Sequence, residues 1–214
     1  MKIDRFKHAF KYCDLVINGS TLKPIYKDNY IDNNGRKFTK KSLSKCRDSR
    51  VYIITSDKEI IKIGSSASVG GVDSTIQFYC DGGLGGSSSP RTIGCFLYLY
   101  KECLNNKTVE IYIMLHEPII TIVPSINGNV ELPINVQSTE WESIVKNEYK
   151  SVCGKYPILN KQENHDVWDD VIMNIASTQR LCKGYERKQK INELMKKYFG
   201  DECEKYNYNE FSLF

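Results

Sequence analysis

Two short apolar runs separated by four polar residues constrain the fold of this chain more than any other feature. The runs cover residues 50–55 and 60–64, and residues 56–59 between them allow only a tight turn. Both runs are rich in isoleucine, which favours strands, so we expect an antiparallel hairpin. A hairpin this short is not stable alone, so it must belong to a larger sheet.

The hairpin also brings two polar side chains together. If Thr55 pairs with Glu59 across a three-residue loop, Tyr52 lies opposite Lys62, because strand side chains alternate between faces. The other face then carries Ile53, Ile61 and Ile63. A phenol beside an ammonium group is a candidate acid–base pair. An ordinary surface pair of tyrosine and lysine is the alternative that the hairpin alone leaves open.

A predicted helix over residues 141–152 carries a carboxylate in an unexpected place. Its apolar stripe consists of Trp141, Ile144, Val145, Tyr149 and Val152. Glu148 follows Ile144 and Val145 by four and three residues, so we expect it to point into this stripe. A buried carboxylate needs a partner, and a bound cation would supply one. Glu140 and Glu142 are rivals, but the helix dipole already favours acids at a helix start.

These features, taken in order, resemble the GIY-YIG nuclease family. Val51-Tyr52-Ile53 and Lys62-Ile63-Gly64 look like its two signature triplets. Glu148 and the later Pro157-Ile158-Leu159-Asn160 look like its metal-binding glutamate and its Pro-x-x-Asn motif. The resemblance covers about residues 50–161. It implies an α+β fold with a small three-stranded mixed or antiparallel sheet, flanked by helices and extended by insertions and by helical elaborations at both termini.

The sequence departs from the family pattern at two positions. Val51 replaces the first glycine, and Lys62 replaces the second tyrosine. Some restriction enzymes of the family resemble this chain in carrying lysine there. An ammonium group can bind a phosphate oxygen, or lower the pKa of Tyr52 by favouring the phenolate. We interpret the site as a variant that remains active.

The family's arginine has a counterpart after a long insertion. Residues 64–90 are rich in glycine and serine, but their Gly82–Ser88 stretch lacks the lysine ending of a nucleotide-binding loop. Ser89 and Pro90 then predict a helix start that carries Arg91 in its first turn. Free N–H groups there favour anions, so Arg91 suits a scissile phosphate. A solvated first-turn arginine is the alternative.

The resemblance implies metal-assisted hydrolysis of double-stranded DNA. Glu148 would hold Mg²⁺, for which Mn²⁺ would substitute, and Tyr52 would accept the proton of the attacking water, directly or through a relay. Lys62 and Arg91 would neutralise the phosphate, and Asn160 would orient the site. No nucleotide cofactor is expected.

Charge and cysteine content set broader bounds. The chain has 214 residues, a net charge of +4 and eight cysteines without any Cys-x-x-Cys pair. Reduced thiols and the absence of an apolar membrane span or signal sequence predict a cytoplasmic protein. Two basic segments are candidate DNA contacts, although such clusters are often plain solvated faces. Their candidate residues are Arg36, Lys37, Lys40, Lys41, Lys45, Arg47, Lys183, Arg187 and Lys188.

We expect one domain, with a basic flank (1–49), a nuclease core (50–161) and a helical flank (162–214). Within it, residues 3–17 are predicted to be helical and 18–37 irregular. Residues 108–115 should form a strand that pairs with the first hairpin. Residues 119–123 and 129–134 surround Asn127-Gly128 and predict a second hairpin that could enter a DNA groove. Two further helices are predicted over residues 167–181 and 185–199.

The core lies between N- and C-terminal flanks and is interrupted by insertions, an organisation that resembles the type II restriction endonucleases of the family. A homodimer would follow, because palindromic sites match twofold protein symmetry. The alternatives are a phage or selfish-element nuclease of relaxed specificity, and a DNA-binding protein that keeps this fold without catalysis.

Overall fold

The computed structural model describes residues 1–46, 48–66, 71–83 and 89–168, together with single positions between 170 and 200. These residues form an α+β fold on a five-stranded sheet with strand order β2-β1-β7-β5-β6. All neighbouring strands are antiparallel. The strands are β1 (Phe10–Asn18), β2 (Thr21–Tyr26), β5 (Ser49–Ser56), β6 (Glu59–Ser65) and β7 (Val109–His116). The predicted α+β class is confirmed, but the sheet has five strands where three were expected.

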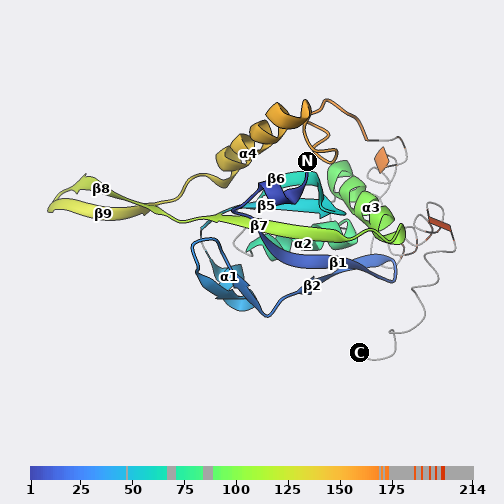
Figure 1. The fold of residues 1–214 in the computed structure, drawn as a ribbon, viewed down its shortest axis with the longest axis horizontal. Coiled ribbons are helices and arrows are strands. Elements are labelled where there is room, and N and C mark those ends of the chain that lie inside the picture. Colours follow the sequence, from blue (N-terminus) through green and yellow to red (C-terminus); the bar gives the residue numbers. More distant parts are fainter. Residues whose placement is uncertain are drawn as a thin grey trace.

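Helices cover both faces of this sheet (Figure 1). On one face, α2 (Gly71–Asp81) and α3 (Pro90–Leu104) form a core with residues such as Tyr52 and Ile54 of β5. On the other face, α4 (Ser138–Cys153) packs on Val51 and Ile53, and a single turn, η1 (Ile3–Arg5), closes the core. The strand β5 is therefore buried on both sides, and its whole length from Ser49 to Ser56 is buried.

The hairpin of β5 and β6 forms as predicted, but with another register. Its loop is only Asp57 and Lys58, whose φ angles are +48° and +70°, as a tight type I′ turn requires. Tyr52 pairs with Gly64, and Ile54 pairs with Lys62. The predicted pairing of Tyr52 with Lys62 is wrong by two positions. A shift of two keeps both side chains on the same face, because alternation has period two.

A β-bulge explains the changed register. Pairing is irregular between Ile54 and Thr55, where Ile61 is the extra residue of β6. Ile61 therefore packs in the core under α2 and α3, while Ile53 and Ile63 pack under α4. The predicted grouping of all three isoleucines on one face is wrong for Ile61.

The prediction of a helix over residues 3–17 is wrong, and so is that of an irregular segment over 18–37. The chain forms β1 and β2 there, and β1 lies between β2 and β7 near the centre of the sheet. Adjacent residues Tyr12 and Cys13 are both buried in the core under α2 and α3, because the pairing of β1 with β7 shifts there and Tyr12 is the extra residue. Pairing on both edges outweighs the local pattern.

Smaller elements precede the hairpin. Strands β3 (Asn29–Ile31) and β4 (Lys37–Thr39) pair with each other. The short helix α1 (Lys40–Lys45) follows, and reciprocal hydrogen bonds of Thr39 and Ser42 cap its start. This helix packs against α2.

The predictions for β7 and α3 are confirmed. β7 pairs with β5 along its full length. The Ser89 side chain caps α3, Pro90 is its first residue, and the helix buries Ile93, Phe96, Leu97 and Tyr100. The helix α2 was not predicted, and it contributes Ile76, Tyr79 and Cys80 to the core.

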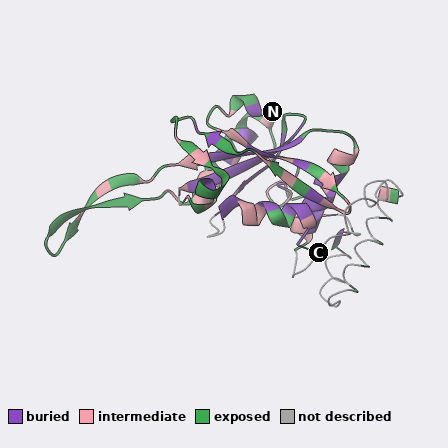
Figure 2. Cartoon of the chain, turned by 90° about the horizontal axis from the view of Figure 1, so that it is seen from below, coloured by how far each residue is buried: buried purple, intermediate pink, exposed green. Residues whose placement is uncertain are grey.

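The second hairpin forms as predicted and projects far from the rest of the fold (Figure 1). It consists of β8 (Ile119–Ser125) and β9 (Gly128–Ile134), which pair only with each other. Figure 2 shows it as an exposed ribbon beside the buried sheet. We call residues 119–134 the arm.

The predicted helices over 167–181 and 185–199 lie largely outside the described residues. Among the helices of the described part, none is both long and apolar enough to cross a membrane.

Candidate functional site

A cavity of about 280 Å³ opens where β5, α2 and the start of α3 meet. Its lining includes Tyr52 from β5, Tyr79 from α2 and Arg91 from the first turn of α3. Ser65, at the end of β6, also lines it. The structure therefore brings Tyr52 and Arg91 together, across 39 residues of sequence that include the glycine-rich insertion.

Tyr52 and Tyr79 share a hydrogen bond of 2.7 Å between their hydroxyl groups. Burial raises the pKa of Tyr52 well above its ordinary value, the charge and hydrogen bond of Tyr79 raise it further, and the charge of Arg91 lowers it. The net direction is upward, so Tyr52 is a neutral phenol in the free protein. The sequence suggested a lowered pKa for Tyr52, but its pKa is raised because burial dominates.

Gly64 is the residue that makes room for the Tyr52 ring. A Cβ atom at Gly64 would lie 2.2 Å from the Tyr52 hydroxyl oxygen and 2.3 Å from the ring carbon that carries it. The ring cannot swing away freely, because Tyr52 is 2% exposed and hydrogen-bonded to Tyr79. The fold therefore requires glycine at this position of the second triplet, because a larger residue would collide with the Tyr52 ring.

Lys62 lies behind the cavity, not in its lining. Its side chain is fully buried, and its Nζ donates a 3.4 Å hydrogen bond to the carbonyl of Leu159. Burial lowers the pKa of Lys62, and Arg91 lowers it too, whereas Glu163 and Glu142 act in the opposite direction. Direct contact of the ammonium group with a substrate, as the sequence suggested, is not the arrangement found.

Asn160 clamps the outer edge of the sheet. β6 is an edge strand, and the Asn160 side chain accepts from the Ile63 N–H and donates to the Ile63 carbonyl, both at 3.0 Å. Leu159 N–H also donates to the Ile61 carbonyl at 2.9 Å. The amide side chain therefore replaces a neighbouring strand. These bonds fix Lys62, which lies between the two clamped residues.

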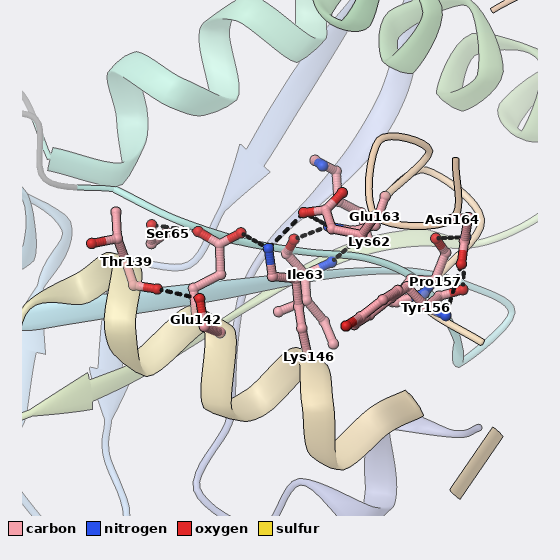
Figure 3. A network of polar contacts seen from close by, with 12 residues as sticks. Lys62, Ile63, Ser65, Thr139, Glu142, Lys146, Tyr156, Pro157, Glu163 and Asn164 are labelled. Atoms are coloured by element: carbon pink, nitrogen blue, oxygen red, sulfur yellow. Dashed lines mark hydrogen bonds and ion pairs between the residues drawn. The ribbon is translucent and has the colours of Figure 1, made fainter. Parts of the chain in front are cut away.

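A polar network joins α4 to this edge (Figure 3). Lys146 makes ion pairs with Glu142 at 3.0 Å and with Glu163 at 2.5 Å. Glu142 also accepts a 2.6 Å hydrogen bond from Ser65, a residue of the cavity lining. Glu142 is therefore the α4 carboxylate that is hydrogen-bonded to the cavity lining.

The predicted position of Glu148 is wrong. Glu148 is exposed, and it lines a different cavity on the opposite side of α4 together with Ile144 and Val152. Ile144 and Val152 are exposed as well, so α4 is buried along Val145 and Tyr149 instead. The sequence placed five apolar residues on one stripe, but the fold buries only Val145 and Tyr149, on the side of α4 that also carries Glu142.

The carboxylates near the cavity that could bind Mg²⁺ are those of Glu142 and Glu163. Within the described residues, no cluster of three or more His, Cys, Asp or Glu side chains is present. Mg²⁺ is often held by one or two carboxylates, with water and substrate phosphate completing its shell. Glu142 and Glu163 share the single ammonium group of Lys146, so this trio retains one negative charge. A carboxylate has about four lone-pair sites, so Glu142 keeps acceptor capacity beside Ser65 and Lys146. The residues fit a cation held jointly with a phosphate.

The basic residues proposed for DNA divide into three groups. Lys37, Lys40, Lys41 and Lys45 are exposed on β4 and α1. Arg36 makes ion pairs with Asp32, Asp48 and Glu117, which gives it a structural role. Arg47, Lys183, Arg187 and Lys188 lie outside the described residues.

Sequence reasoning missed four residues of the site: Ser65, Tyr79, Lys146 and Glu163. Tyr79 belongs to the apolar stretch 76–80, where helical spacing of Ile76, Tyr79 and Cys80 was the available signal. The other three are polar residues whose contacts depend on how α4 and residues 157–164 dock on β6, and no local pattern encodes that docking.

Comparisons with known proteins give distant likenesses. No protein-family model matches the chain, and no curated protein matches it. Among solved structures, the restriction endonuclease HPY188I in complex with product DNA is similar at a TM-score of 0.40 and 19% identity, over 74% of this chain and 84% of that one. A bacteriophage T4 EndoII mutant is similar at a TM-score of 0.40 and 12% identity, over 71% and 92% respectively. No residue role is transferred from either.

Proposed function

We propose that this protein is a magnesium-dependent endonuclease of the GIY-YIG type that hydrolyses phosphodiester bonds in double-stranded DNA. The observation that carries the proposal is the shared cavity of Tyr52 and Arg91, with Glu142 connected to it through Ser65. A phenol and a guanidinium group in one cavity, with a carboxylate hydrogen-bonded to its lining, are suited to phosphoryl transfer, in which charge stabilisation and orientation matter most.

Arg91 binds the scissile phosphate. It projects from the first turn of α3, where free N–H groups and the helix dipole favour anions. Its planar guanidinium group can hydrogen-bond two phosphate oxygens at once. During the reaction the water oxygen bonds to phosphorus and the bond to the leaving oxygen breaks. The positive charge of Arg91 offsets the negative charge that develops on the phosphate oxygens.

Tyr52 orients the attacking water. Because its pKa is raised, it acts as a neutral relay, accepting a hydrogen bond from the water and donating one to Tyr79. Lys62 and Asn160 are positioning residues, since they fix β6 and with it Gly64 beneath the Tyr52 ring.

Glu142, in place of Glu148, is the residue proposed to hold the metal. Bound Mg²⁺, or Mn²⁺ in its place, would polarise the phosphate and stabilise the leaving oxygen. The protein's own part is to hold the carboxylate beside the cavity lining, through Ser65 and Lys146.

Lys37, Lys40, Lys41 and Lys45 are proposed to contact the DNA backbone. Exposed lysines position nucleic acid through phosphate contacts without reading its sequence. A homodimer acting as a type II restriction endonuclease is the specific form that we propose, because a twofold protein matches a palindromic site.

The test is digestion of plasmid DNA by the purified full chain with Mg²⁺, with Mn²⁺ and with a chelator, followed by sequencing of the ends. Metal-dependent cleavage at one short sequence is expected. Dispersed ends would support a nuclease of relaxed specificity instead. DNA binding without cleavage under any metal condition would contradict the enzyme and favour a silent DNA-binding protein.

A further inference from the structure

Lys146 holds two carboxylates together beside the lining of the cavity. Its ammonium group contacts Glu142 at 3.0 Å and Glu163 at 2.5 Å (Figure 3). Because one oxygen of each carboxylate contacts the same nitrogen atom, the two oxygens lie close enough together to share a small cation. The side chains of Lys146 and Glu142 are each 13% exposed, and that of Glu163 is 27% exposed. Water therefore screens these charges only in part.

The two carboxylates come from separate parts of the chain. Glu142 lies on α4, whereas Glu163 follows Asn160, whose side chain clamps β6. Two carboxylates brought together in this way repel each other, and a cation between them offsets the repulsion. In the free protein, Lys146 supplies that cation.

A metal ion at Glu142 would meet this lysine. Mg²⁺ and Mn²⁺ both prefer oxygen ligands such as carboxylates. The two oxygens best placed to bind one cation jointly are those that already contact Lys146. The other oxygen of Glu142 accepts a 2.6 Å hydrogen bond from Ser65, so Glu142 keeps an anchor when the ammonium group is absent. Asn160 gives Glu163 a weaker anchor, a hydrogen bond of 3.4 Å.

We propose that Lys146 competes with the metal for the carboxylates of Glu142 and Glu163. The ammonium group occupies this pair in the free protein, and Glu163 is the second carboxylate that the metal binds. Two carboxylates and one ammonium group leave one negative charge, so a divalent cation gains less there than at the free pair, which carries two. Lys146 thereby lowers the metal affinity of the site. This role depends on the proposed function, which places the metal at Glu142.

The test is a titration of the full chain with Mn²⁺, followed by electron paramagnetic resonance, without DNA and at about 0.15 M salt. Lys146→Met removes the ammonium group and keeps an unbranched side chain. It should lower the dissociation constant for Mn²⁺ by about 10-fold or more. Lys150→Met is the matched control, because it removes the same charge from an exposed position on the same helix. It should leave the constant within about twofold of wild type.

Thermal unfolding monitored by circular dichroism gives a second measurement. Without metal, Lys146→Met should unfold at a lower temperature than the wild type, because two neighbouring carboxylates lose their partner. Mn²⁺ should raise the melting temperature of Lys146→Met more than that of the wild type, because the folded variant binds the ion more tightly.

Glu142→Gln separates this role of Lys146 from the proposed function. It should abolish Mn²⁺ binding both alone and combined with Lys146→Met. Binding that survives Glu142→Gln would contradict the proposed metal site and the role of Lys146 with it. Binding that Glu142→Gln abolishes but Lys146→Met does not tighten, or that Lys150→Met tightens equally, would overturn the role of Lys146 alone. Tighter binding by Lys146→Met only, in a protein that cleaves no DNA, would support the competition and contradict the endonuclease.

Discussion

Glu142 and Glu148 lie six residues apart on one helix and have opposite surroundings. Glu142 is ion-paired to Lys146 and accepts a hydrogen bond from Ser65 at the cavity. Glu148 is exposed beside Ile144 and Val152, which are 55% and 58% exposed. The side of α4 with Glu142 thus faces the fold, while the side with Ile144, Glu148 and Val152 lines the other cavity.

This contrast teaches that an apolar stripe on a helix does not by itself identify the buried face. α4 has apolar residues over a wide arc, and only Val145 and Tyr149 reach the core. Lys146 and Glu142 are half-buried beside them because they satisfy each other and Glu163.

The largest expected effect among the residues around Glu142 is that of Tyr52→Phe. Loss of the hydroxyl should reduce the cleavage rate by about 10²- to 10⁴-fold while the fold is kept. Tyr156→Phe is the matched control, because its hydroxyl bonds Asn147 outside the cavity and should not affect the rate. Single-turnover cleavage of plasmid DNA measures both. A Tyr52→Phe protein with most of its activity would make Tyr52 a packing residue.

Gly64→Ala should act through Tyr52. The added methyl group would meet the Tyr52 hydroxyl and displace the ring, with a loss of about 10²-fold for a displacement near 1 Å. The double variant Gly64→Ala, Tyr52→Phe shows whether the effect of Gly64→Ala depends on the Tyr52 hydroxyl. Its rate should be close to that of Tyr52→Phe alone, because a missing hydroxyl cannot be misplaced further. Two losses that multiply fully would mean that Gly64 acts elsewhere.

Lys62→Met should reveal a stability cost of the buried ammonium. Burial lowers the pKa of Lys62 below its ordinary 10.5. Between the lowered value and 10.5 the unfolded chain binds more protons, so the contribution of Lys62 to the free energy of unfolding rises with pH. The variant should lose this rise and be the more stable protein at neutral pH. Urea unfolding at several pH values measures it, with exposed Lys150→Met as control. If the free energy of unfolding depended on pH in the same way in wild type and Lys62→Met, the ammonium group of Lys62 would be solvated in the folded protein.

The smallest expected effect is on DNA binding. Changing Lys40, Lys41 and Lys45 together to glutamine should weaken binding to specific and random DNA alike. The log–log salt slope should fall by about 0.9 for each lost phosphate contact. Because α1 packs against α2, which carries Tyr79, this result would place DNA on the α2 side of the sheet, where the cavity lined by Tyr52 and Arg91 opens. An unchanged slope would mean that α1 does not contact DNA.

Much of the fold was predictable where local patterns decide it. The existence of the β5–β6 hairpin, though not its register, the capped start of α3 and the Asn127-Gly128 turn of the arm each depend on a few neighbouring residues. β1 was missed because its strand character comes from pairing on both edges with distant segments. The site was predictable to the same extent. Tyr52 and Arg91 follow from short motifs, whereas the choice between Glu142 and Glu148 depends on how α4 docks.

The most direct test of the account compares Glu142→Gln with Glu148→Gln in Mg²⁺-dependent cleavage of plasmid DNA, with DNA binding measured separately in the absence of metal. Both variants should bind DNA as the wild type does. Glu142→Gln should abolish cleavage, because the charge that holds the cation is lost. Glu148→Gln should cleave within about twofold of wild type, as expected for a surface substitution. Cleavage that survives Glu142→Gln and is lost with Glu148→Gln would contradict the assignment of the metal to the cavity side of α4.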